Sequence, residues 1–308
     1  MGLVVLAGGT GSAKLLRGLR DVVGEFTVIS NVGDNLWSHG LYVAPDVDIA
    51  VYALAGIGDV ARGWGLKDET FNVLGQLARI GEETWFNLGD RDLATHIFRT
   101  ERLAHGKRLG EVTEELCARL GVAGQRVIPC TDDRLETHIV TATGTVHLQE
   151  FWVKERGAPE VLGVEYRGAD GARPARAALD ALAAADRIVF CPANPVTSIL
   201  PILAVDGIRQ AVAASGATAR RVAVSPMVGD GPVTGPAGKL MRAVGAEPTS
   251  RGVARLYRGL VDRFLIDASD SPQAAAIQEE GGMEAVPARI LMATHDDEVR
   301  LAREVIDA

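Results

Sequence analysis

The stretch LVVLAGGTGSAKLL at residues 3–16 decides the fold. Residues 3–7 form an uninterrupted apolar run, as expected of a strand that is buried on both faces of a parallel sheet. The glycines at positions 8, 9 and 11 end this run, and a helical pattern begins at Ser12. A strand, a glycine-rich turn and a helix in this order are typical of the first half of a doubly wound, nucleotide-binding unit.

The same alternation of apolar run and Gly- or Pro-rich loop returns along the chain. Further strands are predicted at residues 26–30, 126–130, 186–190, 221–225, 263–267 and 288–292, with a closing helix at about 297–306. We therefore predict an α/β, Rossmann-like, mostly parallel sheet with helices on both faces. In such a sheet the ligand loops gather at the carboxyl ends of the strands.

The middle of the chain has a different pattern. Residues 136–142 and 145–153 alternate apolar and polar side chains around a Thr143-Gly144 turn, which predicts an antiparallel hairpin. Residues 157–186 are rich in Gly, Ala and Arg and are expected to form a mobile linker and a helix. We expect one α/β domain over residues 1–308, with a smaller inserted or appended subdomain at 126–185.

Composition excludes several classes of protein. The chain has 308 residues and 5% aromatic residues. Its net charge of -8 argues against a nucleic-acid surface, because such surfaces need clustered Lys and Arg. Its three cysteines are scattered, so a disulfide framework or a Cys-built zinc site is not expected. No apolar run approaches the roughly 20 residues of a membrane helix, and no basic segment precedes the first strand. A cytoplasmic protein without a membrane partner is therefore expected.

The loop at residues 8–14 is the first candidate site. Glycines let backbone N–H groups approach phosphate oxygens, and the start of the following helix favours an anion. Lys14 lies one turn into this helix, where it could meet a phosphate. The loop matches neither the P-loop pattern nor the dinucleotide fingerprint. Anion binding is favoured over the alternative of a plain tight turn.

Acidic loops form the second candidate site. Asp34, Asp46, Asp48, Asp90 and Asp92 lie in loops that follow predicted strands or open helices. Carboxylates beside phosphate suit Mg²⁺, although Asp is also common at helix caps and turns. Asp46 and Asp48 would share one face in an extended segment, whereas in a helix only one of them would point inward.

Two nearby residues have ordinary alternatives. Arg91, between two aspartates, could form a simple ion pair, and a lone His96 is more often structural than catalytic. The loop CPANPVTSI at 191–199 could shape a polar pocket. The loop SPMVGDGPVTGPAGK at 225–239 could hold backbone amides for a ligand, or could simply be a long loop, and its length favours a function. No nucleophile motif is present, so alignment of phosphates beside an attacking hydroxyl fits better than covalent catalysis.

Six stretches together resemble the 2-phospho-L-lactate transferase family of deazaflavin coenzyme F-420 biosynthesis. They are LAGGTGSAKLL, NVGDN, APDVD, WFNLGDRDLATH, CPANPVTSI and SPMVGDGPVTGPAGKLM, in the family's order. LGDRDLATH and QEFWV favour the coenzyme branch over the wider, less characterised group. The resemblance implies a magnesium-dependent enzyme and a homodimer. It also implies a donor in which phospholactate, or phosphoenolpyruvate, is linked to guanosine diphosphate. In the implied reaction the ribityl hydroxyl of 7,8-didemethyl-8-hydroxy-5-deazariboflavin would attack the distal phosphorus of the donor, and GMP would leave.

The resemblance also assigns roles to individual residues. The nucleotide would be bound by Gly8, Gly9, Thr10, Gly11, Lys14, Asn194, Ser198, Gly238 and Lys239. Asp48 and Asn87 would contact the deazaflavin, although relatives often carry a basic residue in place of Asn87. Candidate magnesium ligands are Asp34, Asp46 and Asp48. The candidate catalytic residues, near the transferred phosphate, are Asp48, Asp90 and Arg91.

Two other classes stay open from the residues alone. A different nucleotide-dependent transferase, such as a sugar nucleotidyltransferase, would act without any deazaflavin. A nucleotide-binding regulator from the wider group would bind nucleotide tightly and form no product.

Overall fold

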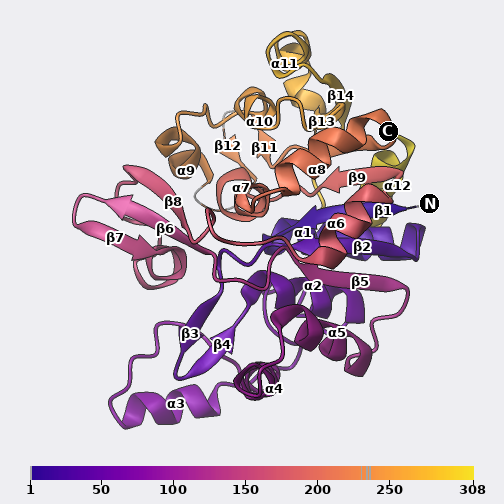
Figure 1. Cartoon of the computed structure of the whole chain (residues 1–308). Helices are drawn as coiled ribbons and strands as arrows, with labels where there is room; N and C mark the ends of the chain where they lie inside the picture. Colours follow the sequence, from indigo (N-terminus) through magenta and orange to yellow (C-terminus); the bar gives the residue numbers. More distant parts are fainter. Residues whose placement is uncertain (1, 230, 234, 236) are drawn as a thin grey trace.

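A computed structural model describes residues 2–229, 231–233, 235 and 237–308 (Figure 1). Its centre is a seven-stranded sheet in the order β14-β13-β10-β9-β1-β2-β5, with every neighbouring pair parallel. The strands are β1 (Leu3–Ala7), β2 (Phe26–Ser30), β5 (Gln125–Pro129), β9 (Arg187–Phe190), β10 (Arg220–Val224), β13 (Arg263–Asp267) and β14 (Glu284–Ala288). The predicted α/β, Rossmann-like sheet is confirmed.

Strands are added to the sheet on both sides of β1, which is buried along its whole length. From β1 the chain first moves outward to β2 and β5, then returns to β9 and continues to β14 on the other side. Because crossovers between parallel strands are right-handed, the two directions place their helices on opposite faces. One face carries α1 (Gly9–Val22), α2 (Pro45–Ala55), α5 (Leu109–Arg119) and the closing α12 (His295–Asp307). The other carries α6 (Arg176–Ala183), α7 (Leu200–Ala204), α8 (Ile208–Ala214), α10 (Ser250–Leu256) and α11 (Ala274–Gly281).

The predicted strand at 288–292 is wrong. The last strand, β14, ends at Ala288, and its Pro287 is tolerated because β14 lies at the edge of the sheet. The apolar residues 290–292 belong to the loop before α12 and line a cavity. The apolar side chains of this loop line the cavity, and a sequence pattern alone cannot distinguish such a loop from a buried strand.

A second sheet, β7-β6-β8, is antiparallel and lies beside the main one (Figure 1). Strands β6 (Glu136–Thr141) and β7 (Gly144–His147) form the predicted hairpin, but the strand predicted to 153 stops at His147 and a π-helix, η1 (Glu150–Lys154), follows. The expected linker contains a third strand, β8 (Gly163–Arg167). Strand β5 pairs with β2 in the main sheet. The division into one domain with a subdomain at 126–185 stays a prediction.

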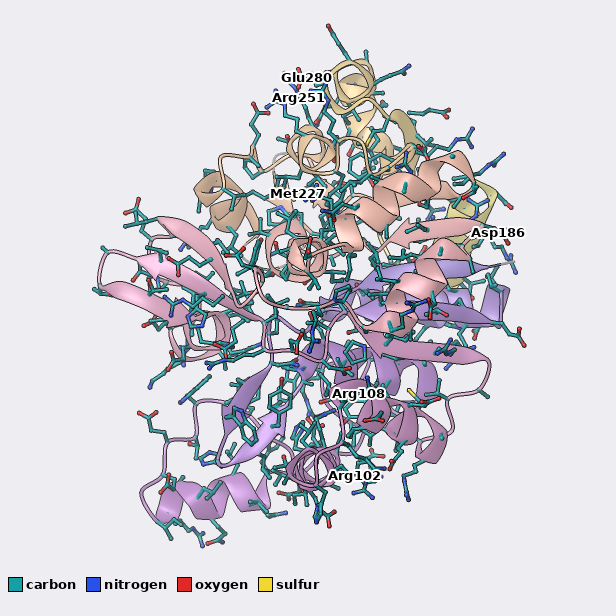
Figure 2. The ribbon with its side chains drawn as sticks, viewed as in Figure 1. Arg102, Arg108, Asp186, Met227, Arg251 and Glu280 are labelled. Carbon is teal, nitrogen blue, oxygen red and sulfur yellow. The ribbon has the colours of Figure 1, made fainter. Side chains whose placement is uncertain are left out.

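The remaining elements are short. Small hairpins are made by β3 (Leu36–Ser38) with β4 (Leu41–Val43) and by β11 (Met227–Val228) with β12 (Gly231–Pro232). Helices α3 (Asn72–Arg79), α4 (Asp92–Ala104) and α9 (Ala237–Ala243), a second π-helix, η2 (Pro195–Ile199), and two short 3-10 helices, η3 (Ser215–Ala217) and η4 (Ala268–Gln273), complete the order. Asp230, Thr234 and Pro236, from the Gly- and Pro-rich stretch, fall outside the described residues. Figure 2 shows Arg251 and Glu280, whose ion pair joins α10 to α11.

Within the described ranges no single helix has the length and apolar character of a membrane span. The helical stretches 195–204 and 208–217 pass that test only as a pair, bent by 89° at the break between them.

Candidate active site

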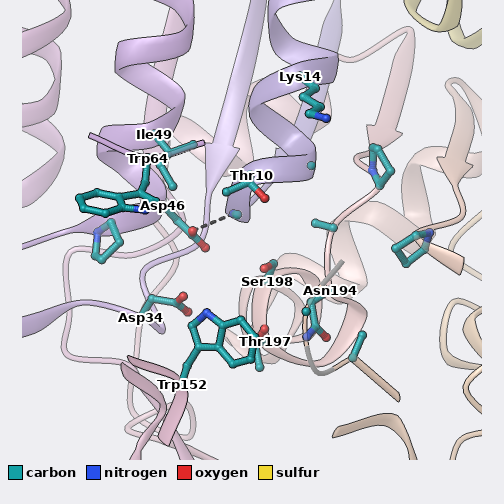
Figure 3. Close-up of a pocket in the computed structure, with 18 of the residues that line it drawn as sticks. Thr10, Lys14, Asp34, Asp46, Ile49, Trp64, Trp152, Asn194, Thr197 and Ser198 are labelled. Carbon is teal, nitrogen blue, oxygen red and sulfur yellow. Dashed lines mark hydrogen bonds between the residues drawn. The ribbon is translucent and has the colours of Figure 1, made fainter. Parts of the chain in front are cut away.

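A cavity of about 580 Å³ opens at the carboxyl ends of β1, β2 and β9 (Figure 3). This is the point where the order of strands reverses, the usual ligand position in an open α/β sheet. Its walls come from segments far apart in sequence: the loop after β1, the start of α2, the π-helices η1 and η2, the loop after β10 and residues 290–293.

The glycine loop packs too closely against its neighbours for larger side chains. A Cβ atom on Gly11 would lie 2.1 Å from the carbonyl oxygen of Pro192, in the loop after β9. A Cβ on Gly8 would lie 2.6 Å from Asp46 Oδ2 and 2.8 Å from Ser198 Cβ. Helix α1 begins at Gly9, so the amides of Thr10 and Gly11 belong to its first turn, where N–H groups lack intrahelical partners. The loop therefore presents free donors and a helix start to the cavity, as anion binding requires.

Asn31, directly after β2, organises two carboxylates in the cavity wall. Its Nδ2 lies 2.9 Å from Asp34 Oδ1, 2.8 Å from Asp46 Oδ2 and 3.0 Å from the Thr197 carbonyl oxygen. An amide nitrogen carries two hydrogens, so three acceptors cannot all be satisfied. The Asn31 orientation is fixed because its Oδ1 accepts from the Gly33 amide at 2.8 Å. Asn31 therefore holds both carboxylates at one nitrogen but cannot fully satisfy all three acceptors.

Burial raises the pKa of both carboxyl groups. The pKa of Asp46 rises to about 6 although Asn31 and the Gly9 amide, 2.7 Å from its Oδ1, oppose the shift. The pKa of Asp34 is raised well above its usual range by burial and then by the charge of Asp46. A divalent cation between them would remove this conflict of charge.

These residues fit magnesium. Mg²⁺ prefers one or two protein carboxylates together with phosphate oxygens and water, and Asp34 and Asp46 supply two beside the anion loop. Among the residues that the structure describes, no group of three His, Cys, Asp or Glu side chains forms an all-protein metal cage. The fit is thus to a metal that arrives with a phosphate ligand.

Asp48 belongs to a different set of partners. It ion-pairs with the fully buried Arg99 of α4, and its Oδ2 lies 3.7 Å from His96 Nδ1. Burial raises the pKa of Asp48, and Arg99 and His96 oppose that shift. Residues 45–55 are helical, and yet Asp46 and Asp48 both line the cavity, so the expectation that a helix would point only one inward is wrong. With a guanidinium beside it, Asp48 is a weaker magnesium candidate than Asp34 or Asp46.

Aromatic side chains line another part of the cavity. Trp64, Phe86 and Trp152 are among its lining residues, and Figure 3 shows the Trp64 and Trp152 rings at separate places around the cavity. The Trp152 side chain is 43% exposed, and its ring lies against the backbone at Gly157 and Gly235. Apolar residues 290–292 add to the lining. This part suits a flat, conjugated ring better than a phosphate.

The structure brings ten of the predicted site residues to the cavity. They are Gly9, Thr10, Gly11, Lys14, Asp34, Asp46, Asp48, Asn87, Asn194 and Ser198. Gly8 is not among the lining residues and packs against Asp46 and Ser198. The Lys14 ammonium donates to the Met292 carbonyl oxygen at 2.9 Å. Asn194 also caps η2 by accepting from the Val196 amide.

The other predicted residues do not line the cavity. Asp90 accepts hydrogen bonds from Thr70, Asn72 and Val73 at the start of α3, and these bonds lower its pKa to about 2. Arg91 is exposed and donates to the Lys67 carbonyl oxygen. Lys239 donates to the Gly157 carbonyl oxygen at 2.8 Å, and its neighbour Gly238 packs near Pro248. A catalytic or nucleotide-binding role for these four residues stays a prediction.

Sequence reasoning missed several residues of the site. Asn31, Tyr52 and Gln149 line or organise the cavity, although Asn31 and Gln149 lie inside quoted motifs. Arg99 gave no signal, because a lone arginine in a helical pattern is normally a surface residue. His96, considered more often structural than catalytic in sequence, lies buried between two carboxylates, with Nδ1 3.7 Å from Asp48 Oδ2 and Nε2 3.5 Å from Asp92 Oδ2.

Comparisons with known proteins give a consistent result. The family model described as 2-phospho-L-lactate transferase CofD matches residues 3–304. A phosphoenolpyruvate transferase of Streptomyces griseus is 45% identical and covers 100% of this chain and 98% of its own. A 2-phospho-L-lactate transferase of Methanopyrus kandleri is 44% identical over 99% of this chain and 96% of its own. A crystal structure of a UPF0052 family member from Bacillus halodurans aligns with a TM-score of 0.64 at 21% identity, over 99% and 98% of the two chains, which supports the fold alone.

Proposed function

The chain belongs to the 2-phospho-L-lactate transferase family, and we propose that it transfers a phospholactyl or enolpyruvyl-phosphoryl group to a deazaflavin. The donor is linked to guanosine diphosphate, and the acceptor is 7,8-didemethyl-8-hydroxy-5-deazariboflavin. The chemistry is a step of coenzyme F-420 biosynthesis, carried out in the cytoplasm by a homodimer.

One observation carries this proposal. A single cavity joins three features: the glycine loop at the start of α1, the carboxylate pair Asp34 and Asp46, and the aromatic side chains of Trp64 and Trp152. The first suits a diphosphate, the second a divalent cation and the third a conjugated ring system. A donor and a planar acceptor can therefore meet in one space.

The reaction is a displacement at phosphorus. The ribityl hydroxyl oxygen bonds to the distal phosphorus of the donor, and the bond from that phosphorus to the bridging oxygen breaks. GMP leaves with the bond's electron pair, and the hydroxyl proton is released. The contribution of the chain is alignment: the first turn of α1 holds the diphosphate, and the buried walls exclude water.

Asp34 and Asp46 would hold magnesium, which would supply neutralisation of phosphate charge. Asn31 keeps the two carboxylates together, and Gln149 Nε2 approaches Asp34 Oδ2 at 3.4 Å from the opposite wall. These contacts keep the carboxylates in place before any ligand arrives.

Binding of the fluorescent deazaflavin to purified protein, with and without GDP and magnesium, tests the proposal. Binding that GDP and magnesium strengthen is expected, because both ligands border the same carboxylates. Nucleotide binding without deazaflavin binding would instead support a regulator or a nucleotidyltransferase.

A further inference from the structure

We propose that Asp90 is a positioning residue of the acceptor site, which holds the Trp64 ring at the cavity wall through Phe71 and Arg62. The inference rests on the proposed function, because Trp64 is one of the aromatic side chains assigned there to the deazaflavin. Asp90 itself does not line the cavity, and its role follows from what its side chain holds.

Both oxygens of Asp90 are occupied by the segment that opens α3. Oδ2 accepts from the Thr70 hydroxyl at 2.6 Å, from the Asn72 amide at 2.9 Å and from the Asn72 side chain at 2.8 Å. Oδ1 accepts from the Val73 amide at 2.9 Å. The Thr70 bond, followed by those of Val73 and Asn72, lowers the pKa of Asp90 to about 2. A general base works best with a pKa near the operating pH, so these contacts favour a carboxylate that orders residues 70–73 over one that takes a proton.

The tie between this segment and the GDRD turn at residues 89–92 is reciprocal. Glu69 Oε1 accepts from the Arg91 amide at 2.6 Å, and its Oε2 accepts from the Asp92 amide at 3.1 Å, at the start of α4. Each of the two carboxylates thus satisfies free N–H groups of the helix that begins beside the other. Gly89 permits this approach, because an added Cβ would lie 2.0 Å from Glu69 Cδ. The two segments are therefore held together at two points.

Phe71 lies within the tied segment and contacts Arg62. The Arg62 guanidinium lies 5.4 Å from the centre of the Phe71 ring and 4.9 Å from the centre of the Trp64 ring. The two rings meet edge to face at 6.3 Å. Asp59 fixes the guanidinium, since its Oδ2 lies 3.1 Å from Arg62 Nη2 and its Oδ1 accepts from the Arg62 amide at 2.9 Å. These cation–π and ion-pair contacts favour one arrangement of the side chains.

Trp64 is the member of this chain of contacts that lines the cavity (Figure 3). It belongs to the loop 57–66, whose base is closed by a bridge between Gly58 and Leu66. Since the base is held separately, the contact with the Arg62 guanidinium sets the orientation of the ring. An aromatic surface that is ordered in advance raises affinity, because less freedom is lost on binding.

Two substitutions at one position separate positioning from catalysis. Asp90→Ala removes all four bonds, whereas Asp90→Asn keeps an oxygen that can accept at the Oδ2 position and loses the carboxylate charge. We expect Asp90→Ala to raise the KM for the deazaflavin about fivefold, on the order of one aromatic contact, while kcat and GDP affinity change little. Asp90→Asn should recover most of the parental KM, because Asn caps helices as well as Asp does.

Arg62→Leu tests the middle of the chain of contacts. It leaves every bond of Asp90 in place and removes the guanidinium from the Trp64 ring, so the KM for the deazaflavin should rise as in Asp90→Ala. Arg62→Lys keeps a cation and should recover part of it. In a Trp64→Ala background neither Asp90→Ala nor Arg62→Leu should weaken deazaflavin binding further, because both act through one ring.

Asp132→Ala is the matched control. Asp132 also satisfies the start of a helix from a distant segment, since its Oδ1 accepts from the Gly110 amide of α5 at 2.7 Å, and it does not line the cavity. The variant should lower the melting temperature, as Asp90→Ala does, and leave the KM for the deazaflavin at the parental value.

The outcomes separate the two proposals. If the parent protein forms no product with either donor, the proposed function fails and the inference fails with it. If the parent is active, a loss of kcat in Asp90→Asn as large as that in Asp90→Ala would overturn the inference and indicate a catalytic carboxylate. Parental KM values for the deazaflavin in both Asp90→Ala and Arg62→Leu would overturn it as well and leave the proposed function intact. Should Asp90→Ala not fold, Arg62→Leu and Asp90→Asn decide together.

Discussion

Asp34 and Asp46 accept hydrogen bonds from the same nitrogen atom, Nδ2 of Asn31, at 2.9 and 2.8 Å. Two carboxylates so close together within a buried wall repel each other when both are ionised. Protonation of one carboxyl or a bound cation relieves this repulsion, and beside a glycine loop a magnesium–phosphate ligand is the partner that we propose. The account of the site depends on this pair.

Replacing Asp34 or Asp46 with Asn should therefore weaken magnesium binding by at least about tenfold, because one of two anionic ligands becomes neutral. The magnesium concentration that gives half-maximal activity measures this effect. The exposed Asp206→Asn is the control and should match the parent. Parental magnesium dependence in both site variants would exclude these ligands.

The pKa values predict how stability varies with pH. The pKa of Asp46 is about 6 in the folded chain against 3.8 as its ordinary value, so the folded state holds a proton that the unfolded state has lost. The contribution of Asp46 to stability is present below about pH 4 and is lost as the pH rises through about 6. Asp34 acts in the same direction.

If Asp34 and Asp46 bind magnesium as proposed, the metal should reverse this loss, because it would bind the ionised pair. Its stabilising effect on the melting temperature should be larger at pH 7.5 than at pH 5, and Asp46→Asn should remove most of that difference. Thermal unfolding at both pH values, with and without magnesium, provides the measurement. An equal magnesium effect at both would contradict the assignment.

Gly11 should not tolerate alanine. The added Cβ would meet the Pro192 carbonyl oxygen at 2.1 Å, and both groups belong to the backbone of cavity loops. We expect a loss of stability on the order of 1–3 kcal/mol and weaker GDP binding. Gly75→Ala is the control, because nothing lies within 4 Å of its Cβ position in α3. Calorimetry on both variants makes the comparison; equal stability would show that the loops can separate freely.

Trp152 should contribute to affinity for the acceptor. Its half-exposed ring lines the cavity, so Trp152→Ala removes a stacking surface with a value of about 1–2 kcal/mol, or roughly tenfold in affinity, while Trp152→Phe keeps part of it. Trp37→Ala is the control, since Trp37 is 62% exposed in β3 and does not line the cavity. Fluorescence titration with the deazaflavin distinguishes them. Unchanged affinity in Trp152→Ala would place the ring elsewhere.

Much of this fold is encoded locally. The apolar run at residues 3–7 followed by glycines predicts β1 and its loop, because a strand buried on both faces needs continuous apolar side chains. The segment at 288–292 has the same character and is not a strand, since its side chains enclose the cavity. An apolar run indicates that a segment is buried, but it does not show whether the segment is a strand or a loop that lines a cavity.

The site was predictable where backbone chemistry dictates the residue. The glycine loop and the carboxylates at strand ends are examples, and both line the cavity. The position of Asp90 outside the cavity lining could not be predicted, because an aspartate that accepts bonds at the start of α3 looks the same in sequence as one that faces a ligand; its role stays a prediction. The burial of Arg99 depends on Asp48, 51 residues away, and no local pattern contains that contact.

The most direct test of the account is turnover. Purified protein would be mixed with the deazaflavin, magnesium and, in separate reactions, the phospholactate and phosphoenolpyruvate donors linked to guanosine diphosphate. GMP and the phosphodiester product would be quantified by mass spectrometry. The account predicts equal amounts of GMP and product with at least one donor, and neither when the deazaflavin is omitted. Tight nucleotide binding with no product from either donor would contradict it.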